Sequence, residues 1–307
     1  MLAAAIGVAM FSLSAPTTKL VLGDSSTLFT AAGRGAIAGV VAGVLLLAGR
    51  APAPNRDLWP RLTVVALGVV IGFPLLTAWG LQSVPSAHGA IVIALLPLAT
   101  VGLGSLLTGE RPSASYWTCS AVGVGAVTAF VAVNGHGTVQ FGDLLLGLAV
   151  LAAACGYAYG AVLSSRMPGW QVICWALVAL LPVTLPLTAI GLGGAGAPDR
   201  ASSWLAFVYT AVGSQLVGFF FWYRGLARAG IARAGQVQLV QPMLSLVWAW
   251  PLVGEPLTAP AVATALVVFA AVAVGRRTAV RRTVGAPPAP AGALVAVELG
   301  ATIDGAR

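Results

Sequence analysis

The chain has 307 residues and a formal net charge of +8, yet only 8% of its residues are Asp, Glu, Lys or Arg. A soluble domain carries about 25% charged residues, whereas 59% of this chain is hydrophobic and its mean hydropathy is +0.95. So few charges cannot cover the surface of a water-soluble body of this size. The composition excludes an ordinary soluble enzyme, a disordered chain and a nucleic-acid-binding module, and it predicts an integral membrane protein.

Long apolar runs predict ten membrane-spanning helices. A helix needs about 20 mostly apolar residues to cross a bilayer. Such runs lie at 2–22, 29–48, 62–82, 87–107, 116–133, 144–164, 170–192, 204–223, 231–253 and 258–275. Turn-type sequences separate them, and no run alternates as a lipid-facing β-strand would. The predicted fold is an all-α integral membrane protein, followed at 276–307 by a basic, Pro/Ala-rich cytoplasmic tail without fixed structure.

The positive residues predict the orientation of these helices. With the N-terminus inside, thirteen of the sixteen Lys and Arg residues lie in inner loops or the tail, and one, Arg200, lies in an outer loop. Cytoplasmic loops carry the excess of Lys and Arg. Both termini are therefore predicted to be cytoplasmic, and the Ala-rich, Lys-poor composition is typical of a GC-rich bacterial genome. The two remaining charges, Lys19 and Arg34, lie within helices.

The two halves of the chain repeat each other. Residues 80–110 match residues 225–255 at an offset of 145, and the matches include a helix proline and a Gly-Glu pair. The predicted repeats are residues 1–135 and residues 142–275, with five helices each. Five is an odd number, so the repeats enter the membrane from opposite sides. Inverted repeats of this kind are typical of secondary transporters.

Three short segments carry a resemblance to a known family. They are Gly109-Glu110-Arg111-Pro112, Gly254-Glu255-Pro256-Leu257 and Trp222-Tyr223-Arg224-Gly225-Leu226. With ten helices in two repeats, the chain resembles the EamA family of the drug/metabolite transporter superfamily over residues 1–275. The resemblance implies a central cavity lined chiefly by helices 1, 3, 4, 6, 8 and 9. It also implies transport of small metabolites, with amino-acid exporters well represented.

The predicted function is a permease that exports a small, amino-acid-like or similar solute across the cytoplasmic membrane by alternating access. No cofactor is expected, and the expected partners are the solute and the lipid bilayer. A coupled proton or counter-substrate stays open, as does the choice between monomer and homodimer. Two alternatives also stay open, an antiporter of phosphorylated or nucleotide-linked sugars and a non-transporting scaffold or sensor. An intramembrane enzyme is excluded because the sequence has no mid-membrane acid pair, HExxH motif or Gly-x-Ser-x-Gly motif.

Prolines and amides inside the helices predict the substrate cavity. Pro97 and Pro242 each remove a backbone donor, and breaks at matching positions of two inverted halves point to a midplane site. Gln238, Gln241 and Ser245 share one helix face, which must contact protein or a water-filled cavity rather than lipid. Hydrogen bonding between helices is the alternative for this stripe.

Other polar residues complete the set of candidates. Further cavity candidates are Ser12, Tyr157, Tyr159 and Gln215. Lys19 and Arg34 either recognise an anionic group, such as a carboxylate, or have a structural role, extending outward to the membrane surface or pairing within the protein. Glu110 and Glu255 lie at helix junctions, where they cap the following helix, gate the cavity or couple protons. His88 is a further titratable group, and the few Cys and His residues predict no metal site.

Overall fold

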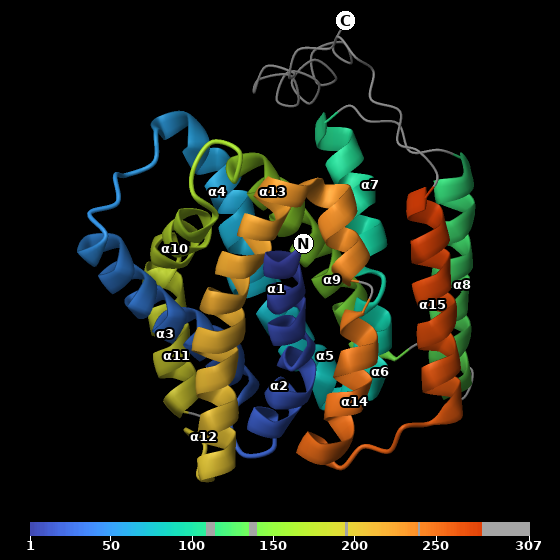
Figure 1. Ribbon diagram of the computed structural model, residues 1–307. Coiled ribbons are helices and arrows are strands. Elements are labelled where there is room, and N and C mark those ends of the chain that lie inside the picture. The colour runs from blue at the N-terminus through green and yellow to red at the C-terminus, as the bar shows by residue number, and fades with distance from the viewer. Residues whose placement is uncertain (109–113, 135–139, 194–195, 239, 278–307) are drawn as a thin grey trace, which may run out of the picture.

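Every regular element that the structure describes is a helix, as the sequence predicts. The computed structural model describes residues 1–108, 114–134, 140–193, 196–238 and 240–277 (Figure 1). The first half contains α1 (Leu2–Ser12), α2 (Ser14–Leu22), α3 (Thr27–Ala48), η1 (Arg56–Leu58), α4 (Trp59–Val65), η2 (Ala66–Gly72), α5 (Phe73–Ser83), α6 (Ser86–Ile93), α7 (Leu96–Thr108) and α8 (Ala114–Asn134). The second half contains α9 (Phe141–Leu163), α10 (Gly169–Ala179), α11 (Leu181–Gly193), α12 (Ala201–Val208), η3 (Tyr209–Gly218), α13 (Phe219–Gln238), α14 (Gln241–Val253) and α15 (Ala259–Arg277).

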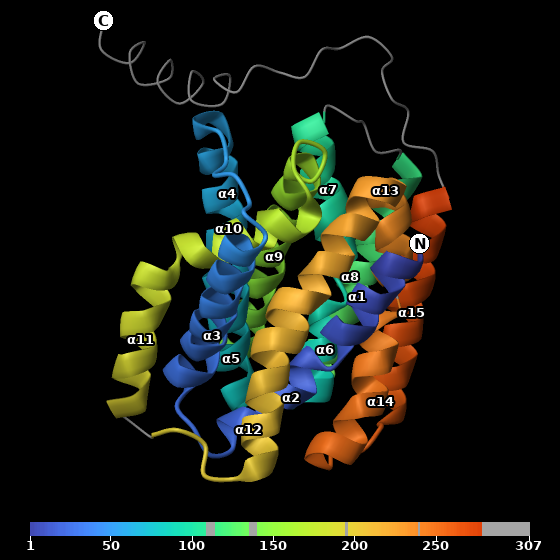
Figure 2. The same ribbon diagram turned by 60° about the vertical axis from the view of Figure 1, so that its left-hand side comes forward.

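The first two helices lie at the centre of the bundle. α1 contacts α13, η3 and α14, while α2 contacts α5, α6, α12 and α14. The two halves of the chain therefore meet along α1 and α2. Around this centre, α3 lies beside α11 and α8 lies beside α15, as both views show (Figure 1, Figure 2).

Glycine lets the central helix approach its neighbour closely. A Cβ on Gly7 of α1 would lie 3.0 Å from both the carbonyl oxygen of Gly218 and the amide nitrogen of Trp222. A Cβ on Gly225 of α13 would lie 2.8 Å from the amide nitrogen of Ala4. Membrane helices have no hydrophobic driving force between them, so small residues at such contacts favour association through close packing.

Large apolar side chains cover the outside of the bundle, where they would contact lipid. Leu47, Leu106 and Leu205 are 80%, 79% and 73% exposed, which is unusual in quantity for a soluble monomer. Among the described residues, six helical segments are long and apolar enough to cross a membrane, and the bent pair α10–α11 makes a seventh. The protein is a multi-pass helical membrane protein, and the count of ten spans stays a prediction.

Two helix breaks occupy matching positions in the two halves. α6 ends at Ile93 and α7 begins at Leu96, whereas α13 ends at Gln238 and α14 begins at Gln241. Both pairs of boundaries differ by the 145-residue offset found in the sequence. Each later helix carries its proline at the second position, where the missing N–H breaks no helical hydrogen bond.

The observed helices differ from the predicted ones at three places. The sequence predicts unbroken helices over 2–22 and 170–192, but Leu13 separates α1 from α2, and α11 bends by 57° from α10. A proline follows shortly after each division, and each proline removes a backbone donor. In the opposite sense, α13 continues through the predicted connection at 224–230. That stretch is made of Arg, Leu, Ala and Gly without a proline, so nothing in it stops helical hydrogen bonding.

Two stretches of the helices that face the centre are π-helical. η2 covers seven residues and continues directly into α5, and η3 covers ten residues and continues into α13. A π-helix leaves backbone groups without their usual partners and is frequent at functional sites. η2 and η3 come from corresponding helices of the two halves, and both border the cavity described next.

Candidate binding cavity

A cavity of about 740 Å³, counting the space at its mouth, lies between the two halves of the chain. Residues of α1, α2, α3, η2, α5, α6, α7, α9, η3, α13 and α14 line it. Eight predicted residues are among them, namely Arg34, Pro97, Tyr157, Gln215, Gln238, Gln241, Pro242 and Ser245. Because Arg34 belongs to α3, the second predicted helix also contributes, which the resemblance did not imply.

The other predicted residues lie elsewhere. Ser12 is buried beside the cavity, where its hydroxyl donates to the carbonyl oxygen of Ala9 at 2.7 Å. Tyr159 packs against the hydrophobic core without lining the cavity. Glu110 lies outside the described residues. Lys19 and Glu255 lie together at another place, at the turn between α5 and α6.

Two polar side chains of the cavity wall bind carbonyls that proline leaves free. Pro16 has no N–H to donate to the carbonyl of Ser12, and the Ser245 hydroxyl donates to this oxygen at 2.7 Å instead. Such a bond between helices is the alternative that the sequence left open for the stripe on α14. Ser245 is thus held by the protein.

The same principle applies to η2. The N–H of Phe73 donates to Gly68 in the π pattern, and Pro74 has no N–H, so the carbonyl of Val69 is left over. The side-chain amide nitrogen of Gln215, from η3, donates to the Val69 oxygen at 2.7 Å. This bond joins the two π-helical stretches across the cavity. The positions of Pro16 and Pro74 in the sequence are the signal that could have located the two freed carbonyls.

Gln238 and Gln241 differ from Gln215 because amide atoms of both lack hydrogen-bond partners among the described residues. Gln238 is 2% exposed, and neither of its amide atoms has a hydrogen-bond partner among the described residues. The amide oxygen of Gln241 also lacks a donor there. A buried polar group without a partner costs about 1–3 kcal/mol. The two amides are thus free to bind water or a solute.

Arg34 is the one charged residue that lines the described part of the cavity. It is 4% exposed, its Nε has no hydrogen-bond partner, and no acid among the described residues forms an ion pair with it. A buried guanidinium stays charged in proteins, and burial of an unpaired charge costs several kcal/mol. The cavity therefore carries an uncompensated positive charge.

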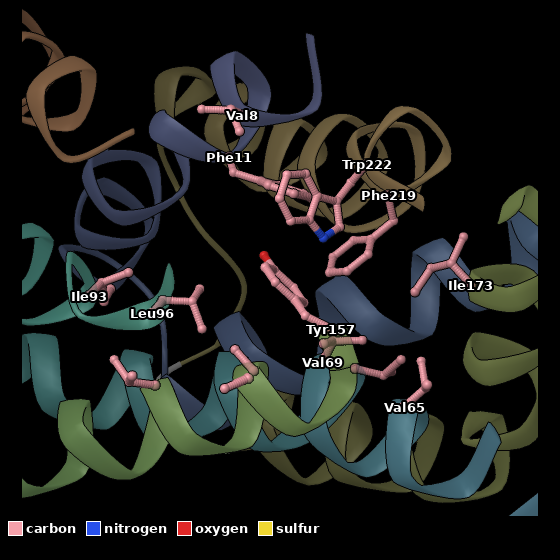
Figure 3. Packing of buried hydrophobic residues seen from close by; sticks show 14 of the residues in the cluster. Val8, Phe11, Val65, Val69, Ile93, Leu96, Tyr157, Ile173, Phe219 and Trp222 are labelled. Atoms are coloured by element: carbon pink, nitrogen blue, oxygen red, sulfur yellow. The ribbon is translucent and has the colours of Figure 1, made fainter. Parts of the chain in front are cut away.

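Aromatic rings form one wall of the cavity. The ring centroids of Phe11 and Phe219 are 4.9 Å apart, and the Tyr157 ring lies 5.8 Å from Phe219. Figure 3 shows these rings gathered with Trp222. The wall offers an apolar face with one polar atom.

Lys19 and Glu255 hold the turn between α5 and α6 from two sides. The ammonium of Lys19 donates to the carbonyl oxygens of Leu81 and Val84, the latter at 3.1 Å. The carboxylate of Glu255 accepts from the backbone N–H of Ser86 at 2.8 Å, from its hydroxyl at 2.9 Å, and from the N–H of Ala87 at 2.7 Å. Lys19 thus binds carbonyls at the C-terminal end of α5, whose C-cap residue is Val84, and Glu255 caps α6.

This arrangement corrects the expectation for Glu255 and decides between the alternatives for Lys19. Glu255 was expected to cap the helix that follows it, but it caps a helix from the other half of the chain because the N-terminus of α6 lies against it. For Lys19, structural pairing was one of the alternatives left open, and its ammonium does bind backbone carbonyls. Helix ends attract charge through their unpaired backbone groups, and sequence spacing does not reveal which distant side chain supplies it.

Three polar residues were not identified from the sequence, namely Ser14, Ser214 and Asp143. Ser14 and Ser214 line the cavity, and their hydroxyls hydrogen-bond each other between α2 and η3. The ring Nε2 of His88 lies 2.6 Å from a carboxylate oxygen of Asp143, and both side chains are buried. Asp143 also accepts from the N–H of Gln140 at 2.9 Å, at the start of α9. A serine in an apolar helix is a weak signal, since it is small enough for any packed interface.

Comparison with known proteins fits this architecture. The profile of the EamA-like transporter family matches residues 1–132 and 140–275. "Uncharacterized transporter YdeK" of Bacillus subtilis is 45% identical over 274 residues, which are 89% of this chain and 96% of that protein. A "Probable terminal-alkyne amino-acid exporter" of Streptantibioticus cattleyicolor is 28% identical over 76% of this chain and 78% of its own.

Two more distant proteins are also similar to this chain. "Aromatic amino acid exporter YddG" of Ancylobacter novellus is 27% identical over 62% of this chain and 66% of its own. A solved crystal structure that is 21% identical superimposes with a TM-score of 0.61 over 89% of this chain and 94% of that one, and this likeness shows the fold alone. Since the family profile matches nearly all of the helical part, the chain belongs to the EamA-like transporter family and is a membrane transporter rather than an enzyme.

Proposed function

We propose that the protein exports a small amino-acid-like solute across the cytoplasmic membrane by alternating access. The observation that carries this proposal is the cavity between the two halves, in which the Nε of Arg34 and both amide atoms of Gln238 are buried without a hydrogen-bond partner among the described residues. Buried polar groups are almost always satisfied by protein, water or ligand, so such a cavity suits a polar solute. Two relatives named as amino-acid exporters, 28% and 27% identical, favour this class of solute.

Rocking of two inverted five-helix repeats would expose the cavity to each side in turn. Transporters of this architecture bind their solutes near the bilayer midplane, where discontinuous helices of both repeats meet. The breaks before α7 and α14 adjoin the cavity, since Pro97 and Pro242 both line it. From the positive-inside rule, we expect both termini to lie in the cytoplasm.

In that orientation, Lys19 and Glu255 lie at the outer side and act as an outer gate. Their contacts tie α2 and the end of α14 to the α5–α6 turn. Opening the cavity to the outside would separate these segments, so the contacts would stabilise the state that is closed to the outside. Release of a solute on the outside would require them to break.

Counterflow in proteoliposomes tests the proposal. Vesicles with the purified protein are loaded with one unlabelled neutral amino acid at a time, and uptake of the same labelled amino acid is followed. We expect counterflow of at least one amino acid, and Gln238→Leu should reduce it about tenfold or more because the amide is part of the cavity. The control is Gln171→Leu on α10, away from the cavity, which should leave the rate unchanged. Absence of counterflow, or equal rates in both variants, would contradict the proposal.

The same assay separates the two alternatives. A nucleotide-linked or phosphorylated sugar brings two or more negative charges, and the described lining offers only Arg34 to balance them. Counterflow of a sugar phosphate would favour that antiporter. A scaffold or sensor would exchange no solute at all.

A further inference from the structure

The cavity has a fixed positive charge, and no described residue of its lining carries the opposite charge. Arg34 lines it, is 4% exposed, and has an Nε without a partner. No Asp or Glu is among the residues that line the described cavity. Most buried arginines pair with a carboxylate of the protein, since the desolvation of the charge is otherwise uncompensated. The described part of the chain therefore supplies no partner for Arg34.

We infer that Arg34 binds the carboxylate of the transported solute, and that this single contact makes the transporter selective for monocarboxylates of the amino-acid type. This inference rests on the proposed export function. A planar guanidinium donates two parallel hydrogen bonds to a carboxylate, and such charge-assisted bonds are about twice as strong as neutral ones. The side chain thus supplies both the charge and the geometry for this group.

The charge balance favours one carboxylate over a phosphate ester. One guanidinium neutralises one negative charge. A phosphate monoester carries about 1.5 to 2 negative charges at neutral pH, and the described lining has no second cation for the excess. An uncompensated charge in a poorly hydrated cavity is costly. A cationic solute would be repelled by Arg34 and would find no acid in the lining.

The rest of the lining fits the other parts of an amino acid. The amide oxygens of Gln238 and Gln241 lack hydrogen-bond donors among the described residues. The protonated amino group of an amino acid supplies three N–H donors. The aromatic wall of Phe11, Tyr157 and Phe219 accepts an apolar side chain. These contacts orient the solute, while Arg34 selects it by charge.

The test compares three forms of the same solute. Wild-type proteoliposomes that show counterflow of a neutral amino acid are given that amino acid, its carboxamide and its decarboxylated amine as competitors. We expect the amino acid to compete at least about tenfold better than the other two, because only it carries the carboxylate. In Arg34→Met this preference should fall to near unity, and Arg34→Lys should keep part of it because the charge remains without the planar fork.

A ratio of competitors does not depend on how much protein folds, so a purely structural role for Arg34 would not move it. Arg200→Met is the matched control, since Arg200 is exposed and pairs with Asp24 outside the cavity. Equal competition by acid and amide in the wild type, or an unchanged ratio in Arg34→Met, would overturn the inference while the counterflow itself would leave the export function standing. If wild-type vesicles move no amino acid, both proposals fail together.

Discussion

Replacing Glu255 by Gln probes the proposed outer gate while it keeps the size of the side chain. One carboxylate oxygen accepts from the N–H of Ser86, and the other accepts from the Ser86 hydroxyl and from the N–H of Ala87. An amide can keep the second pair of bonds, but its NH₂ then faces the remaining N–H donor. The variant also loses the negative charge at the N-terminus of α6, which is worth about 0.3–1 kcal/mol in exposed settings and up to about 2 kcal/mol in partly buried ones.

The magnitude follows from these losses. Hydrogen bonds to charged groups contribute about 1.5–3 kcal/mol and neutral ones about 0.5–1.5 kcal/mol. One bond lost and two weakened would amount to about 4 kcal/mol in a dry site. Glu255 is half-buried, so water screens the charge, and we take about 2 kcal/mol. Every 1.4 kcal/mol is a factor of ten, so the population open to the outside should rise about 30-fold.

Thiol labelling from the outside measures this population. The natural cysteines, Cys119, Cys155 and Cys174, are first replaced, and Thr77→Cys places a single thiol in the cavity. A membrane-impermeant maleimide then labels intact cells, and its rate reports how often the cavity opens outward. We expect Glu255→Gln to raise the labelling rate about 30-fold, because the state closed to the outside loses about 2 kcal/mol of stabilisation.

The control is Asp57→Asn, which removes an acid of the same charge from an exposed ion pair. Arg166 lies 3.3 Å from Asp57, and the two side chains are 47% and 62% exposed. Exposed pairs contribute about 0–1 kcal/mol, so the labelling rate should not change. An unchanged or slower rate in folded Glu255→Gln protein would refute the gate.

Two further predictions concern stability. Gly68→Ala should lower the melting temperature of the purified protein strongly, because a Cβ there would lie 2.4 Å from the carbonyl oxygen of Ala152 on α9, whereas Gly147→Ala meets nothing within 4 Å and should be neutral. An unchanged melting temperature in Gly68→Ala would mean that η2 and α9 lie far enough apart to accept a Cβ, which contradicts the 2.4 Å approach. Ser245→Ala should destabilise the protein by about 1–3 kcal/mol, because the carbonyl that Pro16 leaves free loses its donor; equal melting of Ser245→Ala and wild type in thermal unfolding would show that water replaces the hydroxyl.

The fold was predictable where apolar runs and prolines carry the information. The all-helical membrane architecture follows from composition, and the breaks before α7 and α14 follow from Pro97 and Pro242. The division of α1 from α2 was not predicted, although Pro16 signals it, because a run of apolar residues was read as one helix. π-helical stretches such as η2 have no clear sequence signature, since the extra residue in the turn depends on tertiary contacts.

The cavity was predictable only in part. A polar stripe identifies Gln238 and Gln241, but their lack of partners depends on how distant helices pack. Periodicity alone could not tell Arg34, which faces the cavity, from a side chain that extends to the membrane surface. The partner of Glu255 lies 169 residues away in the chain, and no local pattern encodes such a contact.

The bond from Gln215 to Val69 has a consequence for the direction of transport. If the two halves were identical and related by an exact two-fold axis in the membrane plane, the inward-open and outward-open states would have equal energy. Val70 occupies the position 145 residues before Gln215, and an aliphatic side chain cannot return the bond. The tie between η2 and η3 therefore exists once rather than twice. Under the proposed mechanism, this broken symmetry makes the two end states unequal, so the resting side of the transporter is set by individual side chains rather than by its architecture.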